Sequence, residues 1–165
     1  MAKTVIKFTL DQKDIDRAIK ELKQFKKDFL KKCNQLVQEL TDHGVDVAKV
    51  EVTQLDAVYT GELRNSIEGY FSPQTGIGII SSGDTLYAMY VEFGTGVVGS
   101  QSPHPNPQGY IYDINAHGES GWVYYDDDSG SFRWTKGFKS RPFMYNTARQ
   151  LEKDCKKIAQ DVFGR

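Results

Sequence analysis

The fold is decided by the stretch Asp11–Val52, which reads DQKDIDRAIKELKQFKKDFLKKCNQLVQELTDHGVDVAKVEV. Apolar residues recur three and four positions apart along it, and at about 100° per residue they fall into one stripe of a helix. The stripe consists of Ile15, Ala18, Ile19, Leu22, Phe25, Phe29, Leu30, Cys33, Leu36, Val37, Leu40, Val47 and Ala48. Asp11 suits the N-cap position, and Asp14 lies in the first turn, where the helix dipole favours a carboxylate. We therefore expect one long amphipathic helix that ends near Val52.

A glycine interrupts this stripe. Gly44 lies near its middle, where glycine costs about 1 kcal/mol relative to alanine. It marks either a kink in the helix or a place where another backbone crosses closely.

The two flanks of the predicted helix carry opposite charges. One flank has Lys13, Lys20, Lys27 and Lys31, and the other has Asp14, Glu21, Asp28 and Glu39. Two interpretations follow. The flanks are a solvated surface with ordinary pairs within the helix, or the helix lies between two copies of itself, with basic flank against acidic flank.

Charge is also uneven along the whole chain. Residues 1–33 carry ten basic and five acidic side chains, residues 34–100 carry two and nine, and residues 101–165 carry nine and eight. The net charge of −1 argues against binding to nucleic acid through a basic surface. The uneven distribution favours a surface that meets an oppositely charged neighbour.

Short strands are predicted on both sides of the chain's middle. Val5–Leu10 alternates as a strand does. The segments 66–71 and 76–81 flank a turn and predict a hairpin, and strands are also expected at 110–114, 121–125 and 132–134, the last two joined by a tip at 126–130. Tyr87–Phe93 fits a short helix or a short strand equally well.

The two remaining segments are a loop and a closing helix. Gly94–Gly109 is rich in glycine and proline and carries no charge, so we expect a surface loop that becomes ordered only against a neighbour. Deletion of Val98–Gln108 is expected to leave a folded domain. A helix opens at Ser140–Phe143, with Pro142 at the favoured first position. The fold class is thus α+β. A long N-terminal helix and a C-terminal helix pack on one face of a mostly antiparallel, twisted sheet in a single domain, residues 1–165.

Composition and motifs exclude several classes of function. The chain of 165 residues has a mean hydropathy of −0.53, and its short apolar runs predict neither a membrane span nor a secretion signal. The three histidines are far apart, and Asp126–Gly130 is interpreted as a hairpin tip rather than a cation site. Cys33 and Cys155 lie on apolar helical faces, so we expect them reduced and largely buried. We expect no enzyme, no metal and no cofactor.

Three segments resemble one family of tailed-phage proteins. Tyr59–Ile67 (YTGELRNSI) resembles its Thr-Gly-x-Leu-Arg-x-Ser-Ile element, and Tyr87–Gly96 (YAMYVEFGTG) resembles its Tyr-Ala-x-Tyr-Val-Glu-Phe-Gly-Thr element. Arg141–Met144 (RPFM) resembles the opening of its last helix. The family is the tail-component proteins of long-tailed phages, which act in tail completion or head–tail joining. The likeness covers roughly residues 12–96 and 140–163, so 97–139 is interpreted as an insertion.

The motif residues have expected structural roles. Thr60 would cap a short helix, Gly61 would allow the chain to turn, and Leu63 and Ile67 would face the core. Arg64 is the expected partner of Glu92, because a carboxylate in an apolar segment needs a donor. The motifs also contain Ser66, Phe93, Gly94, Thr95, Arg141, Pro142 and Phe143, of which Phe143 is expected to plug the end of the sheet.

The resemblance implies a virion structural protein of the neck or upper tail, made in the bacterial cytoplasm. It would form a ring, six copies by tail symmetry, and bind the head connector and the tail tube or terminator proteins, but no membrane and no specific nucleic-acid sequence. The alternative is a small carbohydrate- or ligand-binding domain, because aromatic residues crowd the second half of the chain. We favour core and interface roles for these aromatic residues.

Overall fold

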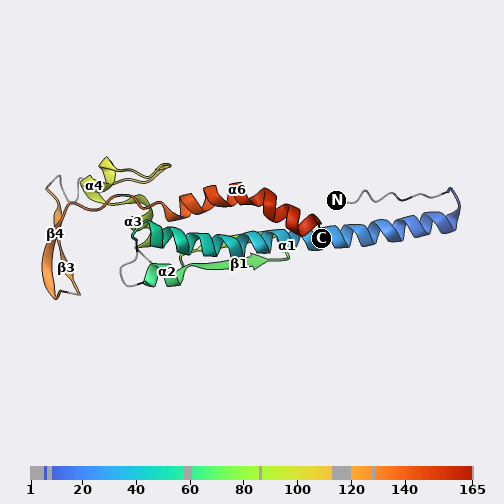
Figure 1. Cartoon of the computed structure of the whole chain (residues 1–165), viewed down its shortest axis with the longest axis horizontal. Helices are drawn as coiled ribbons and strands as arrows, with labels where there is room; N and C mark the ends of the chain where they lie inside the picture. The colour runs from blue at the N-terminus through green and yellow to red at the C-terminus, as the bar shows by residue number, and fades with distance from the viewer. Residues whose placement is uncertain are drawn as a thin grey trace.

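The computed structural model describes residues 6, 9–57, 61–85, 87–112, 120–127 and 129–164. The molecule is elongated around one helix, α1 (Gln12–Gln54) (Figure 1). Helix α6 (Phe143–Gly164) lies along one side of α1, and the hairpin of β1 (Glu68–Ser72) and β2 (Ile77–Ser81) lies along the other. The predicted long helix and closing helix are both confirmed.

The start of α1 follows the expected chemistry. Asp11 occupies the N-cap position without a side-chain cap bond, and Asp14 accepts hydrogen bonds from the Thr9 hydroxyl at 2.7 Å and the Thr9 amide at 3.3 Å. The Thr9 hydroxyl is the main reason that the pKa of Asp14 is lowered, and Arg17 adds to it. Residues 5, 7 and 8 of the expected strand lie outside the described residues, and Ile6, Thr9 and Leu10 are not in a strand.

Gly44 marks a close approach and not a kink. A Cβ atom at this position would overlap the Ile80 side chain of β2 and lie 3.0 Å from Leu151 of α6. Side chains rather than a crossing backbone meet it. The first hairpin also approaches α1 closely at glycines, because Gly69 and Gly78 face α1 at Thr41. These glycines let the hairpin and α6 pack tightly against the second half of α1.

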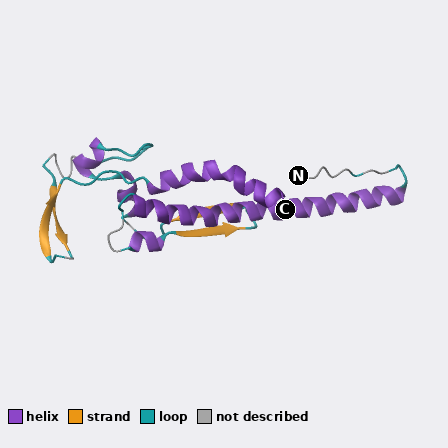
Figure 2. Ribbon diagram, viewed as in Figure 1, coloured by secondary structure: helices purple, strands orange, loops and turns teal. Residues whose placement is uncertain are grey.

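The expected single sheet is wrong. The predicted hairpins form, but as two separate two-stranded sheets, one of β1 and β2 and one of β3 (Trp122–Asp126) and β4 (Ser131–Thr135). They lie far apart in Figure 2 because the chain between them runs through helices and loops at one end of α1. Helix α1 lies between the first hairpin and α6. The N-terminal and C-terminal helices, α1 and α6, therefore do not pack on the same face of one sheet. Tyr110–Tyr112 is irregular, and 113–114 lies outside the described residues.

Three short helices surround the C-terminal end of α1. They are α2 (Glu62–Ser66), α3 (Ala88–Phe93) and α4 (Gly96–Gln101). Tyr87–Phe93 was predicted as either a short helix or a short strand, and the structure shows a helix, α3. The expectation that Gly94–Gly109 is wholly irregular is wrong, because α4 lies within it. Two backbone hydrogen bonds hold the start of this segment against the chain before α6, from the Thr95 amide to the Phe138 carbonyl at 2.9 Å and from the Val98 amide to the Lys136 carbonyl at 3.2 Å.

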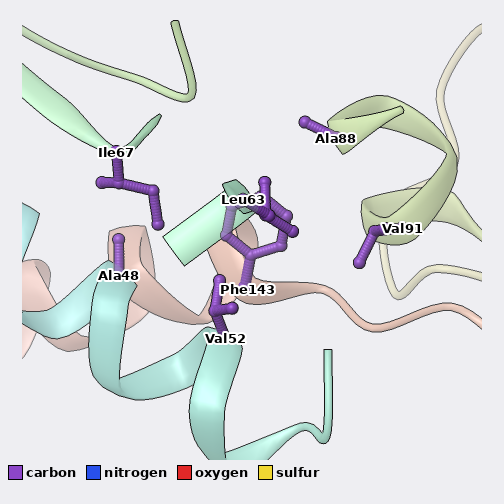
Figure 3. Close-up of a cluster of buried hydrophobic side chains, with 7 residues drawn as sticks. All are labelled: Ala48, Val52, Leu63, Ile67, Ala88, Val91 and Phe143. Carbon is purple, nitrogen blue, oxygen red and sulfur yellow. The ribbon is translucent and has the colours of Figure 1, made fainter. Parts of the chain in front are cut away.

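The core lies where α2, α3 and the start of α6 meet α1 (Figure 3). It consists of Ala48, Val52, Leu63, Ile67, Ala88, Val91 and Phe143. The inward positions predicted for Leu63 and Ile67 are confirmed. Phe143 points into the middle of this cluster in Figure 3 and does not plug a sheet end. The core is small and occupies only one end of a long molecule.

The two cysteines and the absence of a predicted membrane span were further expectations. Cys33 and Cys155 are free but only half-buried, so their expected burial is wrong. Cys33 lies on α1 and Cys155 on α6, and part of each side chain is open to solvent. No helix in the described ranges combines the length and the apolar character needed to cross a membrane.

Candidate functional site: exposed apolar surfaces

The first surface is the N-terminal part of α1, Gln12–Lys32, which we call the arm. The turn of the first hairpin reaches only to Asn34, whose amide donates to the Pro73 carbonyl at 3.3 Å. Helix α6 reaches only to Phe29, whose ring centroid is 5.8 Å from that of Phe163. Neither α6 nor the first hairpin extends along the rest of the arm (Figure 2). Every residue from Glu21 to Lys31 is exposed.

The apolar stripe of α1 is therefore covered along its second half and largely open from Ile19 to Leu30, whereas Ala18 of the same stripe is buried. Five large apolar side chains of the arm are 42–56% exposed, namely Ile19, Leu22, Phe25, Phe29 and Leu30. Phe25 and Phe29 stack on each other with centroids 6.2 Å apart. A soluble monomer rarely exposes apolar side chains in one continuous row, and such a row marks a binding surface.

The candidate interface charges all lie on the arm. On the acidic flank, Asp14 pairs with Arg17 at 2.8 Å and Asp28 accepts from Gln24 at 3.0 Å, so part of this flank is engaged within the helix. Glu21 is exposed. The basic flank differs, because Lys13, Lys20, Lys27 and Lys31 are exposed and form no ion pair with another described residue. The basic flank is thus free to meet a neighbour.

The second surface is the outer face of the first hairpin. Gly69 and Gly78 turn toward α1, so the alternate residues point outward. Tyr70 and Ile79 are directly opposed in the register, and both are more than half exposed, as is Ile77. The three apolar side chains form the middle of this face, Glu68 and Ser81 lie at one end, and Ser72 lies beside Ile77.

The third surface is one face of the β3–β4 hairpin. Val123 is paired with Trp134 and Tyr125 with Phe132, and these four side chains are 52–76% exposed. The expected core role of these aromatic residues is wrong. A lone two-stranded hairpin is marginal in water, and its apolar face favours a partner. Asp126 lies at the tip as predicted, where Arg133 pairs with it at 2.7 Å and Ser129 donates to it at 2.7 Å.

Glu92 is buried, but its expected partner is wrong. Arg64 is exposed. The carboxylate of Glu92 instead accepts from the backbone amides of Met144 and Tyr145, both at 2.9 Å, and from His104 Nε2 at 3.0 Å. The Asn106 amide donates to His104 Nδ1 at 2.9 Å, which assigns the ring proton to Nε2. Glu92 on α3 thus caps the N-terminus of α6 from outside that helix.

His104 is the residue that sequence reasoning missed, because loop histidines are usually exposed and this one is 5% exposed. The available signal was the absence of charge in Gly94–Gly109, which favours burial over a solvated loop. Phe93 holds the ring from one side with centroids 4.5 Å apart and also stacks on Tyr110 at 4.6 Å.

The other motif residues join the segments of the fold. Arg141 donates from Nε to the Leu55 carbonyl at 3.2 Å, and Ser140 Oγ donates to the Glu92 carbonyl at 2.6 Å. Thr95 Oγ1 accepts from the Phe138 amide at 3.3 Å, and Gly94 packs against the Ser140 backbone. Pro142 was predicted at the first position of the closing helix, but α6 begins one residue later, at Phe143. The second and third motif segments are therefore in contact.

The first motif segment is only partly described. Gly61 has a left-handed φ of 81°, which confirms its expected turn. The Leu63 amide donates to the Tyr87 hydroxyl at 3.1 Å, and Ser66 Oγ donates to the Leu63 carbonyl at 2.9 Å. Thr60, the expected cap, lies outside the described residues.

Comparisons with protein-family models, curated proteins and solved structures found no match for this chain. Within the described ranges, no group of three or more His, Cys, Asp or Glu side chains is placed to hold a metal ion. The motif residues that the structure describes hold segments of the chain together.

Proposed function

We propose that this protein is a structural component of a phage neck or upper tail, and that it works by assembling with copies of itself and with neighbouring virion proteins. The observation that carries the proposal is the largely exposed apolar stripe of the arm. The resemblance of three ordered segments to the tail-component family supplies the biological setting. In that setting the protein is made in the bacterial cytoplasm and resides in the virion.

Physical chemistry supports an assembly role for the arm. Apolar surface left in water costs about 25 cal/mol per Å² relative to its burial. Most of the stability of a helix in a protein comes from packing of its amphipathic face. A largely exposed stripe on the arm is therefore costly in a free monomer and favourable once a partner covers it. The same argument applies to the β3–β4 hairpin.

The buried motif residues support a structural role over a catalytic one. Glu92, the carboxylate with the most unusual surroundings, is occupied by two backbone amides and His104. These hydrogen bonds join α3 to α6, so the carboxylate of Glu92 has a structural role. We propose no catalysis and no cofactor, a ring of six copies, and contacts with the head connector and the tail tube or terminator proteins.

The test is negative-stain microscopy of the purified protein with and without isolated tail tubes, with the arm intact and in a Phe25→Glu variant. We expect rings at the tube ends with the intact chain and none with Phe25→Glu. Gln24→Lys is the matched control, because Gln24 lies on the side of the arm away from the stripe. Unbound particles of the intact chain at all concentrations would contradict the proposal.

A second candidate function is ligand binding by the β3–β4 face. The exposed rings of Tyr125, Phe132 and Trp134 favour it, because sugars stack on such rings. Saturable quenching of tryptophan fluorescence by a glycan, lost in Trp134→Ala, would support this candidate over assembly.

A further inference from the structure

We infer that the arm of one copy docks, head to tail, on the outer face of the β1–β2 hairpin of a second copy. This inference rests on the proposed assembly function and names the two surfaces that meet. Both surfaces are exposed and apolar: Leu22, Phe25 and Phe29 on the arm, and Tyr70, Ile77 and Ile79 on the hairpin.

The stripe of the arm is long enough to cover the hairpin. The stripe from Ile19 to Leu30 spans eleven steps, or about 17 Å at the rise of an α-helix. The hairpin strands have five residues each, which is four steps or about 13 Å at the rise of a strand. Docking would place the hairpin between its own α1 and the neighbour's arm, so that both of its faces pack on a helix, which is a stable layered arrangement.

Charge favours the hairpin over a second arm as the partner. The arm, Gln12–Lys32, carries eight basic and four acidic side chains, for a net charge of +4. Pairing two arms would bring these like charges together. The hairpin, residues 68–81, carries one acidic side chain, Glu68, and no basic one. Arm against hairpin is therefore the complementary pairing.

One pair of residues makes the docking specific. Lys26 lies within the angular range of the apolar stripe at about 100° per residue, where a lysine is out of place unless a carboxylate meets it. Glu68 lies at the end of the outer face of the hairpin and is the one charged residue on it. Both side chains are exposed, and neither forms an ion pair with another described residue. In the docked pair, Lys26 of one copy meets Glu68 of the next.

Such a contact is heterologous, because different surfaces of the two copies meet. It leaves a free arm at one end and a free hairpin at the other, so it propagates until a ring closes. Pairing of two arms would instead stop at a symmetric dimer. The two arrangements therefore predict different cross-links.

Cross-linking tests the inference in a Cys33→Ala/Cys155→Ala background of the full chain. Lys26→Cys and Glu68→Cys variants are mixed and oxidised mildly, and we expect a disulfide-linked dimer only in the mixture. Gln24→Cys mixed with Glu68→Cys is the control and should stay uncross-linked. A dimer formed by Lys26→Cys alone would show that two arms pair and would overturn the inference.

Charge reversal gives a second readout. By sedimentation velocity, Lys26→Glu and Glu68→Lys should each weaken self-association about tenfold, and the chain with both changes should recover most of it. Circular dichroism checks that each variant is folded. A chain that forms rings without a Lys26–Glu68 cross-link overturns this inference alone, whereas a chain that neither self-associates nor binds tail tubes overturns the proposed function as well.

Discussion

The carboxylate of Glu92 and the ring of His104 lie 3.0 Å apart in the interior, and both side chains are less than a tenth exposed. Two backbone amides at the start of α6 share the same carboxylate. This arrangement joins α3, the segment after α4 and α6 at one point. We expect it to be the main polar determinant of stability in the molecule.

Replacing Glu92 tests this centre. Glu92→Ala should lower the free energy of unfolding by about 3 kcal/mol or more, because a buried donor set loses its acceptor. Chemical denaturation measures it. Arg64→Ala is the control, since Arg64 is exposed and surface changes usually stay within about 0.5 kcal/mol. Equal midpoints for Glu92→Ala and the native chain would contradict the role of this centre.

Deletion of Val98–Gln108 should now be strongly destabilising. The segment contains His104 and most of α4, so its removal leaves Glu92 with one donor fewer and uncovers Phe93. The structure therefore predicts the opposite of the sequence, from which Val98–Gln108 was expected to be dispensable for folding. Thermal unfolding followed by circular dichroism measures it, and a deletion variant with an unchanged midpoint would restore the original expectation.

Gly44→Ala tests the close packing of α1. The new methyl group would overlap Ile80, and overpacking of this kind costs about 1–3 kcal/mol. Ile80→Val in the same chain should recover part of the loss. Gly164→Ala is the control, because a Cβ there meets nothing and alanine is the better helix former. A neutral Gly44→Ala would mean that α6 and the hairpin adjust freely.

The His43–Asp154 pair predicts a pH effect. His43 Nε2 lies 2.9 Å from Asp154 Oδ2, and this hydrogen bond, followed by that of Gln150, lowers the pKa of Asp154 below its ordinary value of 3.8. A lowered folded pKa stabilises the protein above the unfolded pKa, and the effect is lost as pH falls through the folded pKa. Asp154→Asn should therefore destabilise at pH 5 but much less near the acid limit of folding.

An NMR titration gives the direct readout of that pair. The carboxyl of Asp154 should titrate below 3.8, and His43→Ala should move the midpoint upward. Asp28 serves as an internal reference, because it lies on the arm, away from this pair. A midpoint of Asp154 that is insensitive to His43→Ala would contradict the assigned cause.

The sequence by itself determined the local elements. The recurrence of apolar residues from Ile15 to Ala48 requires a helix, because only that period places them on one side. Turn residues between alternating segments determined both hairpins, and the inward positions of Leu63 and Ile67 followed from their spacing of four. These features depend on neighbours a few residues away, which a sequence pattern records.

Tertiary structure alone decided which parts of those elements are covered. The stripe of α1 has one continuous pattern, yet α6 and the first hairpin end at Phe29 and Asn34 and leave the large apolar side chains of the arm exposed. Glu92 needed a donor by its chemistry, but its donors come from 12 residues away at His104 and about 50 away at Met144 and Tyr145. Such pairings depend on where distant segments meet in space, and the periodicity of a helix or strand carries no information about that meeting point.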